Sequence, residues 1–101
     1  MSLETVTEKI RQKIDMAPQI SAKVKFDFGD DGLIFIDASD HSDIRISHDD
    51  EDADVTLKCS LDTFKGLMDG TKDPNICFMM GKLKVQGNMG LAMKLNAVLE
   101  D

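Results

Sequence analysis

Four short segments of this chain alternate between apolar and charged or polar residues, and this alternation constrains the fold more than any other feature. In residues 19–29, Val24 and Phe26 fall on one side of an extended chain and Lys25 between them falls on the other. Similar alternation marks residues 44–46, 55–59 and 82–86, and residues 33–38 are predicted as the return strand after a turn. Because each segment keeps one polar side, we expect a sheet with water on one face and helices on the other.

The N-terminal segment and the turn after the first strand have local signals of their own. Residues 2–16 place apolar side chains at helical spacing, with Ser2 as a candidate N-cap and Pro18 after the helix. Asp30-Asp31-Gly32 is typical of a hairpin turn, so the first two strands should be antiparallel neighbours.

Three more helices are predicted in the C-terminal half. Ser60 is a favourable N-cap for the first of them and Gly70 is placed to end it. Pro74 is tolerated in the first turn of a short second helix, and Asn88 can cap a last helix that reaches Leu99. Together these signals predict one α+β domain over residues 1–101, with a five-stranded, mostly antiparallel sheet and helices on one face.

Composition excludes several classes of function. A formal net charge of −7 argues against nucleic-acid binding and against electrostatic docking on anionic lipid, which leaves at most transient membrane contact. The chain has no apolar run near the length of a membrane span and its start does not resemble a signal peptide. We therefore expect a cytoplasmic protein.

The cysteines and histidines form no motif typical of catalysis or of zinc binding. Cys59 and Cys77 both lie in apolar stretches, which favours free buried thiols over a disulfide. His41 and His48 lie in an acidic segment that could hold a divalent cation weakly, but the segment lacks EF-hand spacing and a solvated acidic turn is the favoured interpretation. We predict no enzyme activity, no cofactor and no metal.

The last helix has apolar residues on two sides. Its main stripe consists of Leu91, Ala92, Leu95, Val98 and Leu99. Met89 and Met93 lie one turn apart and away from the centre of that stripe, and five of the seven methionines fall between residues 68 and 93. The second side could be ordinary core, the wall of a ligand cavity or a surface for a partner protein.

The free energy of unfolding limits how large an empty cavity this domain can keep. An enclosed empty cavity of about 300 Å³ would lower that free energy by roughly 7 kcal/mol. The free energy of unfolding of such a domain is only about 5–15 kcal/mol. We therefore expect a cavity that is partly collapsed, loosely packed or filled, and the glycines at positions 66, 70, 87 and 90 agree with loose packing.

Two stretches of the chain carry a family likeness. The stretch GKLKVQGNMGLAMKL, residues 81–95, closely resembles the hallmark segment of the sterol carrier protein family, the nonspecific lipid-transfer domain. Upstream, DADVTLKCSLDTFKGLMDGTKDP, residues 52–74, resembles the strand, helix and glycine turn of that family in the same order. The resemblance implies a hydrophobic tunnel between sheet and helices, and non-catalytic binding or transfer of sterols, fatty acids, fatty acyl-CoA or phospholipids.

The resemblance also implies which residues form the tunnel wall. The candidates are the apolar residues of the last three helices and the last strand: Phe64, Leu67, Met68, Ile76, Phe78, Met79, Met80, Leu83, Val85, Met89, Leu91, Ala92, Met93 and Leu95.

The C-terminal residues differ from those of peroxisomal family members, which end in a tripeptide of the S-K-L type after a further tail. This sequence ends at Leu99-Glu100-Asp101, which supports the cytoplasmic expectation and leaves the tunnel mouth either open or closed by a partner. The alternative function is a protein–protein interaction module that uses the methionine-rich face without lipid. The direction of the methionine side chains should discriminate between the two, and the oligomeric state stays open.

Overall fold

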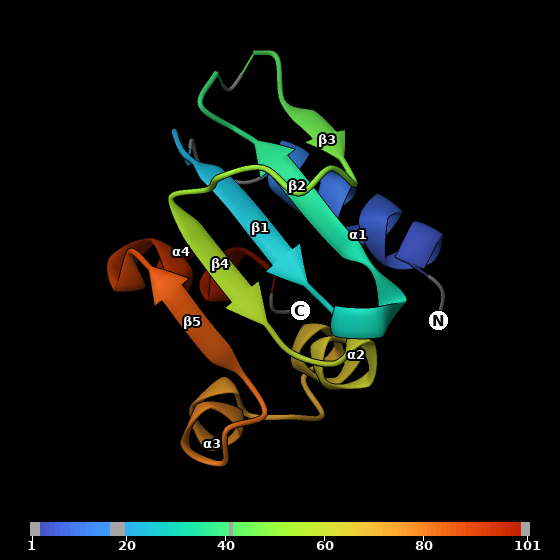
Figure 1. Ribbon diagram of the computed structural model, residues 1–101, viewed down its shortest axis with the longest axis vertical. Helices are drawn as coiled ribbons and strands as arrows, with labels where there is room; N and C mark the ends of the chain where they lie inside the picture. Colours follow the sequence, from blue (N-terminus) through green and yellow to red (C-terminus); the bar gives the residue numbers. More distant parts are fainter. Residues whose placement is uncertain (1–2, 17–19, 41, 100–101) are drawn as a thin grey trace.

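The computed structural model describes residues 3–16, 20–40 and 42–99 (Figure 1). The elements follow the order α1 (Leu3–Asp15), β1 (Lys23–Asp27), a 3-10 turn (Gly29–Asp31), β2 (Leu33–Asp37), β3 (Arg45–Ser47), β4 (Val55–Lys58), α2 (Leu61–Asp69), α3 (Pro74–Met79), β5 (Lys84–Gly87) and α4 (Met89–Leu99). Each predicted helix and strand is therefore present at its expected place in the chain. The cap proposed at Ser2 and the stop proposed at Pro18 lie outside the described residues.

One parallel pairing joins the two halves of the chain into a single sheet. The strand order is β3-β2-β1-β4-β5, and β1 runs parallel to β4 while the other neighbours are antiparallel. This confirms a mostly antiparallel five-stranded sheet. The β1–β4 register brings Val24 beside Val55 and Phe26 beside Leu57, so the apolar sides of both halves face the same way.

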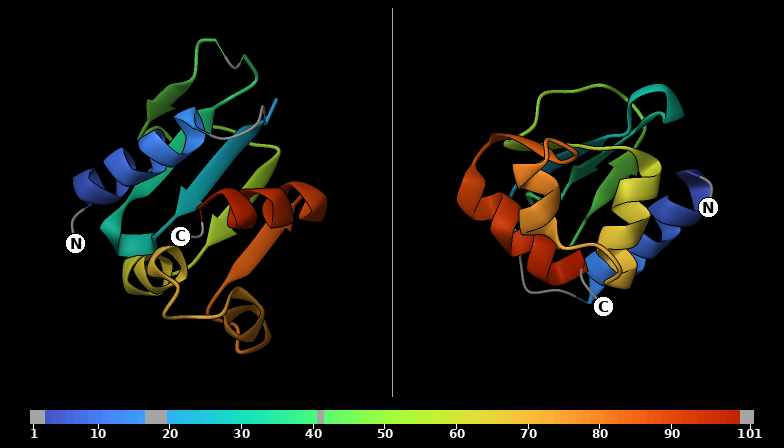
Figure 2. Two further views of the ribbon diagram at one scale, coloured as in Figure 1. Left: turned by 180° about the vertical axis from the view of Figure 1, so that it is seen from behind. Right: turned by 90° about the horizontal axis from the view of Figure 1, so that it is seen from below.

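The helices cover one face of the sheet, as the alternation predicts. Figure 2 shows α1 and α4 crossing the back of the sheet and α2 and α3 lying near its lower end. The side chains that lose nearly all contact with solvent come from α1, β1, β2, β4 and α4: Val6, Ile10, Ile14, Val24, Phe26, Ile34, Ile36, Val55 and Leu95. Of the residues that the structure describes, no helix combines the length and the hydropathy needed to span a membrane.

The opposite face of the sheet is less open than its alternating pattern suggests. The segment 48–54 crosses in front of β1 and β2 (Figure 1), and the ammonium of Lys25 lies 2.7 Å from a carboxylate oxygen of Asp50. Phe35 and Thr56 neighbour Lys25 in the sheet and are buried, although they point away from the helices. The expectation of a fully hydrated face was therefore wrong at its centre, because side-chain alternation does not report what a later loop covers.

Asp54, at the end of this segment, holds three parts of the chain together. Its backbone N–H donates to the carbonyl of Lys23, and its carboxylate accepts from the Lys23 N–H at 2.8 Å. Its carbonyl accepts from the Asn88 N–H at 3.1 Å. Gly87 packs so closely here that a Cβ would lie 2.4 Å from that carbonyl oxygen. Asp54 is thus a connector between strands, and Gly87 reflects close packing, which contradicts our association of it with loose packing.

Gly70 also has a structural role. It adopts a left-handed conformation, with φ of +81°, directly after α2 and forms the C-cap of that helix. This confirms the predicted helix stop and again gives a reason for the glycine other than loose packing.

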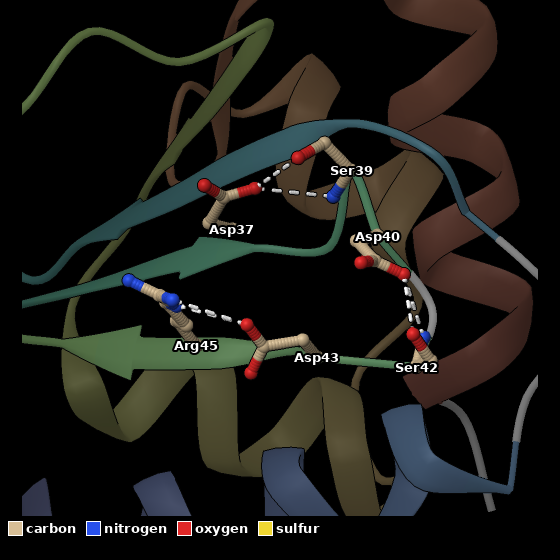
Figure 3. A network of polar contacts seen from close by, with 6 residues as sticks. All are labelled: Asp37, Ser39, Asp40, Ser42, Asp43 and Arg45. Carbon is tan, nitrogen blue, oxygen red and sulfur yellow. Dashed lines mark hydrogen bonds and ion pairs between the residues drawn. The ribbon is translucent and has the colours of Figure 1, made fainter.

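The acidic loop between β2 and β3 is organised by local polar contacts (Figure 3). The carboxylate of Asp37 accepts from both the N–H and the hydroxyl of Ser39, and Asp40 accepts from Ser42 in the same way. Asp43 pairs with the Arg45 guanidinium at 3.1 Å. Within the described ranges, no group of three or more His, Cys, Asp or Glu residues could hold a metal ion, and His41 lies outside them.

The lowered pKa values of two carboxyls predict that acid destabilises the fold. The Ser39 hydroxyl lowers the pKa of Asp37 from 3.8, and the hydrogen bond from Lys25 lowers that of Asp50. A folded-state pKa below the unfolded one gives stability that is present above 3.8 and lost as pH falls through the folded value. Urea unfolding at about pH 6 and about pH 3 should show lower stability at the acidic pH. Asp50→Asn should reduce this difference, and an unchanged difference would contradict the contribution of the Asp50–Lys25 pair.

Leu95 should be the most sensitive position in α4 because its side chain is fully buried, at 0% exposure. Leu95→Ala is expected to lower the free energy of unfolding by about 2–5 kcal/mol, since it removes buried methyl groups and leaves a cavity. The matched control is Ala97→Ser, an exposed position in the same helix, which should change stability by less than about 0.5 kcal/mol. Urea denaturation measures both variants, and equal small effects would show that α4 packs loosely.

Candidate functional site

A cavity of about 380 Å³ lies between the helix-covered side of the sheet and the last three helices. Figure 2, right, shows α2, α3 and α4 together at this end of the molecule. The lining residues come from β4, α2, α3, β5 and α4: Leu57, Phe64, Leu67, Met68, Pro74, Asn75, Phe78, Leu83, Val85, Met89, Ala92, Met93 and Asn96. Every segment of the wall except β4 was predicted to contribute to it.

The floor of the cavity is rigidly packed. The hydroxyl of Ser60 accepts from the Thr63 N–H at 3.0 Å, which confirms the predicted cap and fixes the start of α2. One turn further on, the ring of Phe64 lies 5.2 Å, centroid to centroid, from the rings of both Phe26 and Phe28. Since Phe64 and Met68 are buried, this side of the cavity is continuous with the hydrophobic core.

The rim of the cavity is apolar but exposed. Phe78 and Met89 are each 48% exposed, and Met93 is 72% exposed. The cavity therefore opens to solvent between α3 and the start of α4. An open cavity avoids the full cost of an enclosed empty one, because its outer side is in contact with water rather than with vacuum.

The short helix α3 holds its side of the rim through backbone contacts at both ends. The carboxylate of Asp73 caps it by accepting from the Asn75 N–H at 2.8 Å. Near its other end, the carbonyl of Cys77 accepts from the N–H groups of Lys82 and Leu83 at 2.9 and 3.1 Å. These bonds tie α3 to the chain that enters β5, and so place Phe78 at the mouth.

The structure brings most of the sequence candidates together in this wall. Those in the wall are Phe64, Leu67, Met68, Phe78, Leu83, Val85, Met89, Ala92 and Met93. Five others lie elsewhere. Ile76 and Met79 of α3 and Met80 directly after it are exposed, Leu91 is half-buried against the core, and Leu95 is wholly buried in it. These five were carried over from the family resemblance as apolar residues of the wall segments, and a position within a segment does not fix which side of a helix faces a cavity.

Sequence reasoning missed four lining residues. Leu57 was assigned only to the sheet, and Pro74 was considered only as a helix start. Asn75 and Asn96 are polar, so a search for apolar patterns passes over them. The helical positions of Asn96 and Met93, three residues apart, offered the one signal that could have found Asn96.

The wall offers no group for acid–base or nucleophilic chemistry. Of the lining residues that the structure describes, the only polar side chains are the amides of Asn75 and Asn96, which do not titrate. The arrangement suits the exclusion of water from an apolar molecule, with two amides available to hydrogen-bond a polar atom near the mouth.

The surroundings of the Cys59 thiol make it poorly suited to nucleophilic attack. Burial, and then the proximity of Cys77 and Asp27, raises the pKa of the Cys59 thiol to about 12. Both cysteines are free thiols, Cys77 buried and Cys59 half-buried. The thiolate of Cys59 is therefore scarce at neutral pH, which agrees with a packing role for this residue.

Two known proteins show the sequence similarity of this chain to others. Hydroxysteroid dehydrogenase-like protein 2 from Bos taurus is 33% identical over 95 residues, which are 93% of this chain and 23% of the relative. Sterol carrier protein 2 from Homo sapiens is 37% identical over 67 residues, which are 66% of this chain and 12% of the relative. The chain thus spans less than a quarter of the length of these curated relatives.

Solved structures share the fold over nearly the whole chain. The apo form of sterol carrier protein 2 from Yarrowia lipolytica matches with a TM-score of 0.67 and 25% identity, covering 94% of this chain and 77% of that one. Sterol carrier protein 2 from Aedes aegypti, solved in complex with palmitate, matches with a TM-score of 0.75 and 21% identity, covering 99% of this chain and 100% of that one.

A family model confirms the family resemblance that was seen in residues 52–74 and 81–95. It describes the SCP-2 sterol transfer family and matches residues 3–100 of this chain. Since that match includes every element of the sheet and all the helices around the cavity, the chain belongs to the SCP-2 sterol transfer family.

Proposed function

We propose that this protein binds a long apolar lipid in the cavity between α2, α3, β5 and α4 and carries it without chemical change. The observation that carries this proposal is the combination of an apolar wall, a volume of about 380 Å³ and an exposed rim of Phe78, Met89 and Met93. Membership of the SCP-2 sterol transfer family supports it. So does the palmitate complex of the Aedes aegypti relative, whose fold this chain shares.

The size and chemistry of the cavity define the ligand class. Ligand pockets span roughly 300–1,000 Å³, so this one suits a single acyl chain in its present form. Transfer from water to the wall contributes about 0.8 kcal/mol for each buried methylene. Fatty acids, fatty acyl-CoA, sterols and phospholipids are the candidate ligands, and flexible Met89 and Met93 at the rim allow the larger ones to enter. A polar head group would remain at the mouth, near Asn75 and Asn96.

The alternative function, a protein interaction module without lipid, is less well supported. Met68, Met89 and Met93 line the cavity, which favours a ligand by the criterion set from the sequence. Met79 and Met80 do not line it and are exposed to solvent.

Native mass spectrometry of protein purified without detergent tests the proposed function directly. We expect a bound lipid at about one per chain, or uptake of added fatty acid, acyl-CoA or a sterol analogue at that ratio, since one cavity has room for one ligand. Organic extraction of the purified protein would then identify the ligand class. A clean apo mass with no uptake of any of these compounds would contradict the proposal.

Met93→Glu should separate ligand binding from stability. Because Met93 is 72% exposed, a carboxylate there remains hydrated in the ligand-free protein. A bound lipid would remove that hydration, so we expect affinity for a fluorescent fatty acid to fall at least about tenfold. The free energy of unfolding should fall by less than about 1 kcal/mol.

The matched control is Met16→Glu, because Met16 is 87% exposed and lies outside the cavity wall. It should leave fatty-acid affinity unchanged. Parallel losses of affinity and stability in Met93→Glu would show that Met93 belongs to the core rather than to the ligand site.

A further inference from the structure

The sulfur atoms of this protein differ in how far an oxidant in water can reach them. Cys77 is buried, and burial is the main reason why the pKa of the half-buried Cys59 thiol is raised to about 12. Its reactive thiolate form is therefore scarce at neutral pH. Met68 is buried in the floor of the cavity. A mild oxidant thus meets exposed methionine thioethers before it meets a reactive thiolate.

The exposed methionines of the described residues divide into two kinds. Met16, Met79 and Met80 are 87%, 84% and 63% exposed and lie outside the cavity wall. Met89 and Met93 are 48% and 72% exposed and belong to that wall. Solvent therefore reaches all five side chains, but of these five only Met89 and Met93 are placed to contact a ligand in the cavity.

Met89 and Met93 form one continuous part of the rim. They are four residues apart on α4, so their side chains are neighbours on the same face of the helix. Ala92 and Asn96 line the cavity from the same helix. A lipid chain that fills the cavity covers the inner side of both thioethers and displaces the water beside them. Occupancy of the cavity and the chemical state of these two sulfurs are therefore coupled.

Hydrogen peroxide converts a methionine thioether to a sulfoxide without a further cofactor. One oxygen atom is transferred to a lone pair of the sulfur: the S–O bond forms as the O–O bond of the peroxide breaks, and water is the other product. The sulfur loses two electrons and the peroxide gains them. Methionine sulfoxide reductases reverse the change with two electrons from thiols and release the oxygen as water. The product is uncharged, but a polar group has replaced an apolar one.

A sulfoxide at this rim opposes the binding of an apolar ligand. In the ligand-free protein its oxygen is in contact with water, because Met89 and Met93 are exposed. The oxygen can also accept from the amide of Asn96, which lines the same wall three residues after Met93. A bound acyl chain removes the water and offers no donor, so binding has to overcome the desolvation of the sulfoxide. The same oxidation at Met79 or Met80 leaves the cavity wall unchanged.

We propose that Met89 and Met93 form a redox-modification site at the cavity mouth, where oxidation to sulfoxides by peroxide lowers the affinity for an apolar ligand and bound ligand shields the two sulfurs from oxidation. The inference rests on the proposed function, because it requires a lipid in the cavity. It adds a reversible control of that function: an oxidant favours release of the lipid, and reduction of the sulfoxides restores binding.

Peptide mapping by mass spectrometry after brief treatment with dilute hydrogen peroxide tests the shielding. The full chain is oxidised with and without a saturating amount of palmitate, and the gain of one oxygen atom is followed at each methionine. We expect palmitate to slow the oxidation of Met89 and Met93 at least about threefold, since a pocket buries most of the surface of its ligand against its wall. Met16, Met79 and Met80 are internal references that should be oxidised at unchanged rates.

Affinity for a fluorescent fatty acid before and after oxidation tests the effect on binding. The oxidised wild-type chain should bind at least about fivefold more weakly, because a covered sulfoxide loses its water. Reduction of its sulfoxides by methionine sulfoxide reductases should restore the affinity.

A pair of double variants assigns the effect to the rim. Met89→Leu/Met93→Leu keeps an apolar rim without sulfur, so peroxide should not lower its affinity, whatever that affinity is before treatment. The matched control, Met79→Leu/Met80→Leu, removes two exposed sulfurs that lie outside the wall. It should lose affinity on oxidation as the wild-type chain does.

Equal rates of oxidation of Met89 and Met93 with and without bound palmitate would overturn the proposal. So would loss of affinity in peroxide-treated Met89→Leu/Met93→Leu, because the cause would then be oxidation of another residue, such as Met68. An oxidised wild-type chain that binds as before, or that stays weak after its sulfoxides have been reduced, would also overturn it.

Failure of this inference is distinguishable from failure of the proposed function. Native mass spectrometry of the untreated chain shows whether palmitate binds at all. Bound palmitate together with unshielded Met89 and Met93 overturns the redox site and leaves lipid binding intact. A chain that takes up neither palmitate nor the fluorescent fatty acid contradicts the proposed function for this ligand class and, with it, this inference.

Discussion

The parallel pairing of β1 with β4 is the constraint on which the rest of the structure depends. It joins the N-terminal hairpin to the C-terminal half, and it sets Phe26 beside Leu57 on the helix-covered face. Asp54 fixes the end of this pairing through hydrogen bonds to Lys23 and Asn88. The chain can then form α2 over Phe26 and Phe28 and complete the sheet with β5. A shift of this register by one residue would turn the apolar sides of β4 away from the core.

The cavity results from unequal packing across the sheet. Val6, Ile10 and Ile14 of α1 and Leu95 of α4 are fully buried behind the central strands. In contrast, α2, α3 and the start of α4 enclose the region behind the edge strand β5 less completely. Phe64 and Met68 give this region a packed floor, and Met89 and Met93 give it an adaptable rim. The same unequal packing allows a small domain to remain stable while it keeps space for a lipid, since the open side is hydrated and only the floor has to be dry.

Charge and apolar surface are distributed along the longest dimension of the molecule. The β2–β3 loop, whose carboxylates are held by Ser39, Ser42 and Arg45 (Figure 3), lies at the end opposite α3 (Figure 1). The end around α3 carries Lys82 and Lys84 together with the exposed aspartates of the turn Gly29–Asp31. The acidic loop favours solubility, and salt screens the charges at one end of the molecule from those at the other. A single net charge is therefore a poor guide to the contacts of this protein.

The sequence by itself determined the elements, their order, the helix caps at Ser60 and Asn88 and the family, because these depend on local spacing and on contiguous motifs. Only the tertiary structure decided which apolar residues face the cavity. Leu95 and Met93 are two positions apart in one helix, yet one is buried in the core and the other is exposed at the rim. It also decided that segment 48–54 covers Phe35 and that Leu57, Asn75 and Asn96 share a wall. These outcomes depend on contacts between segments distant in the chain, and periodicity within one segment carries no information about them.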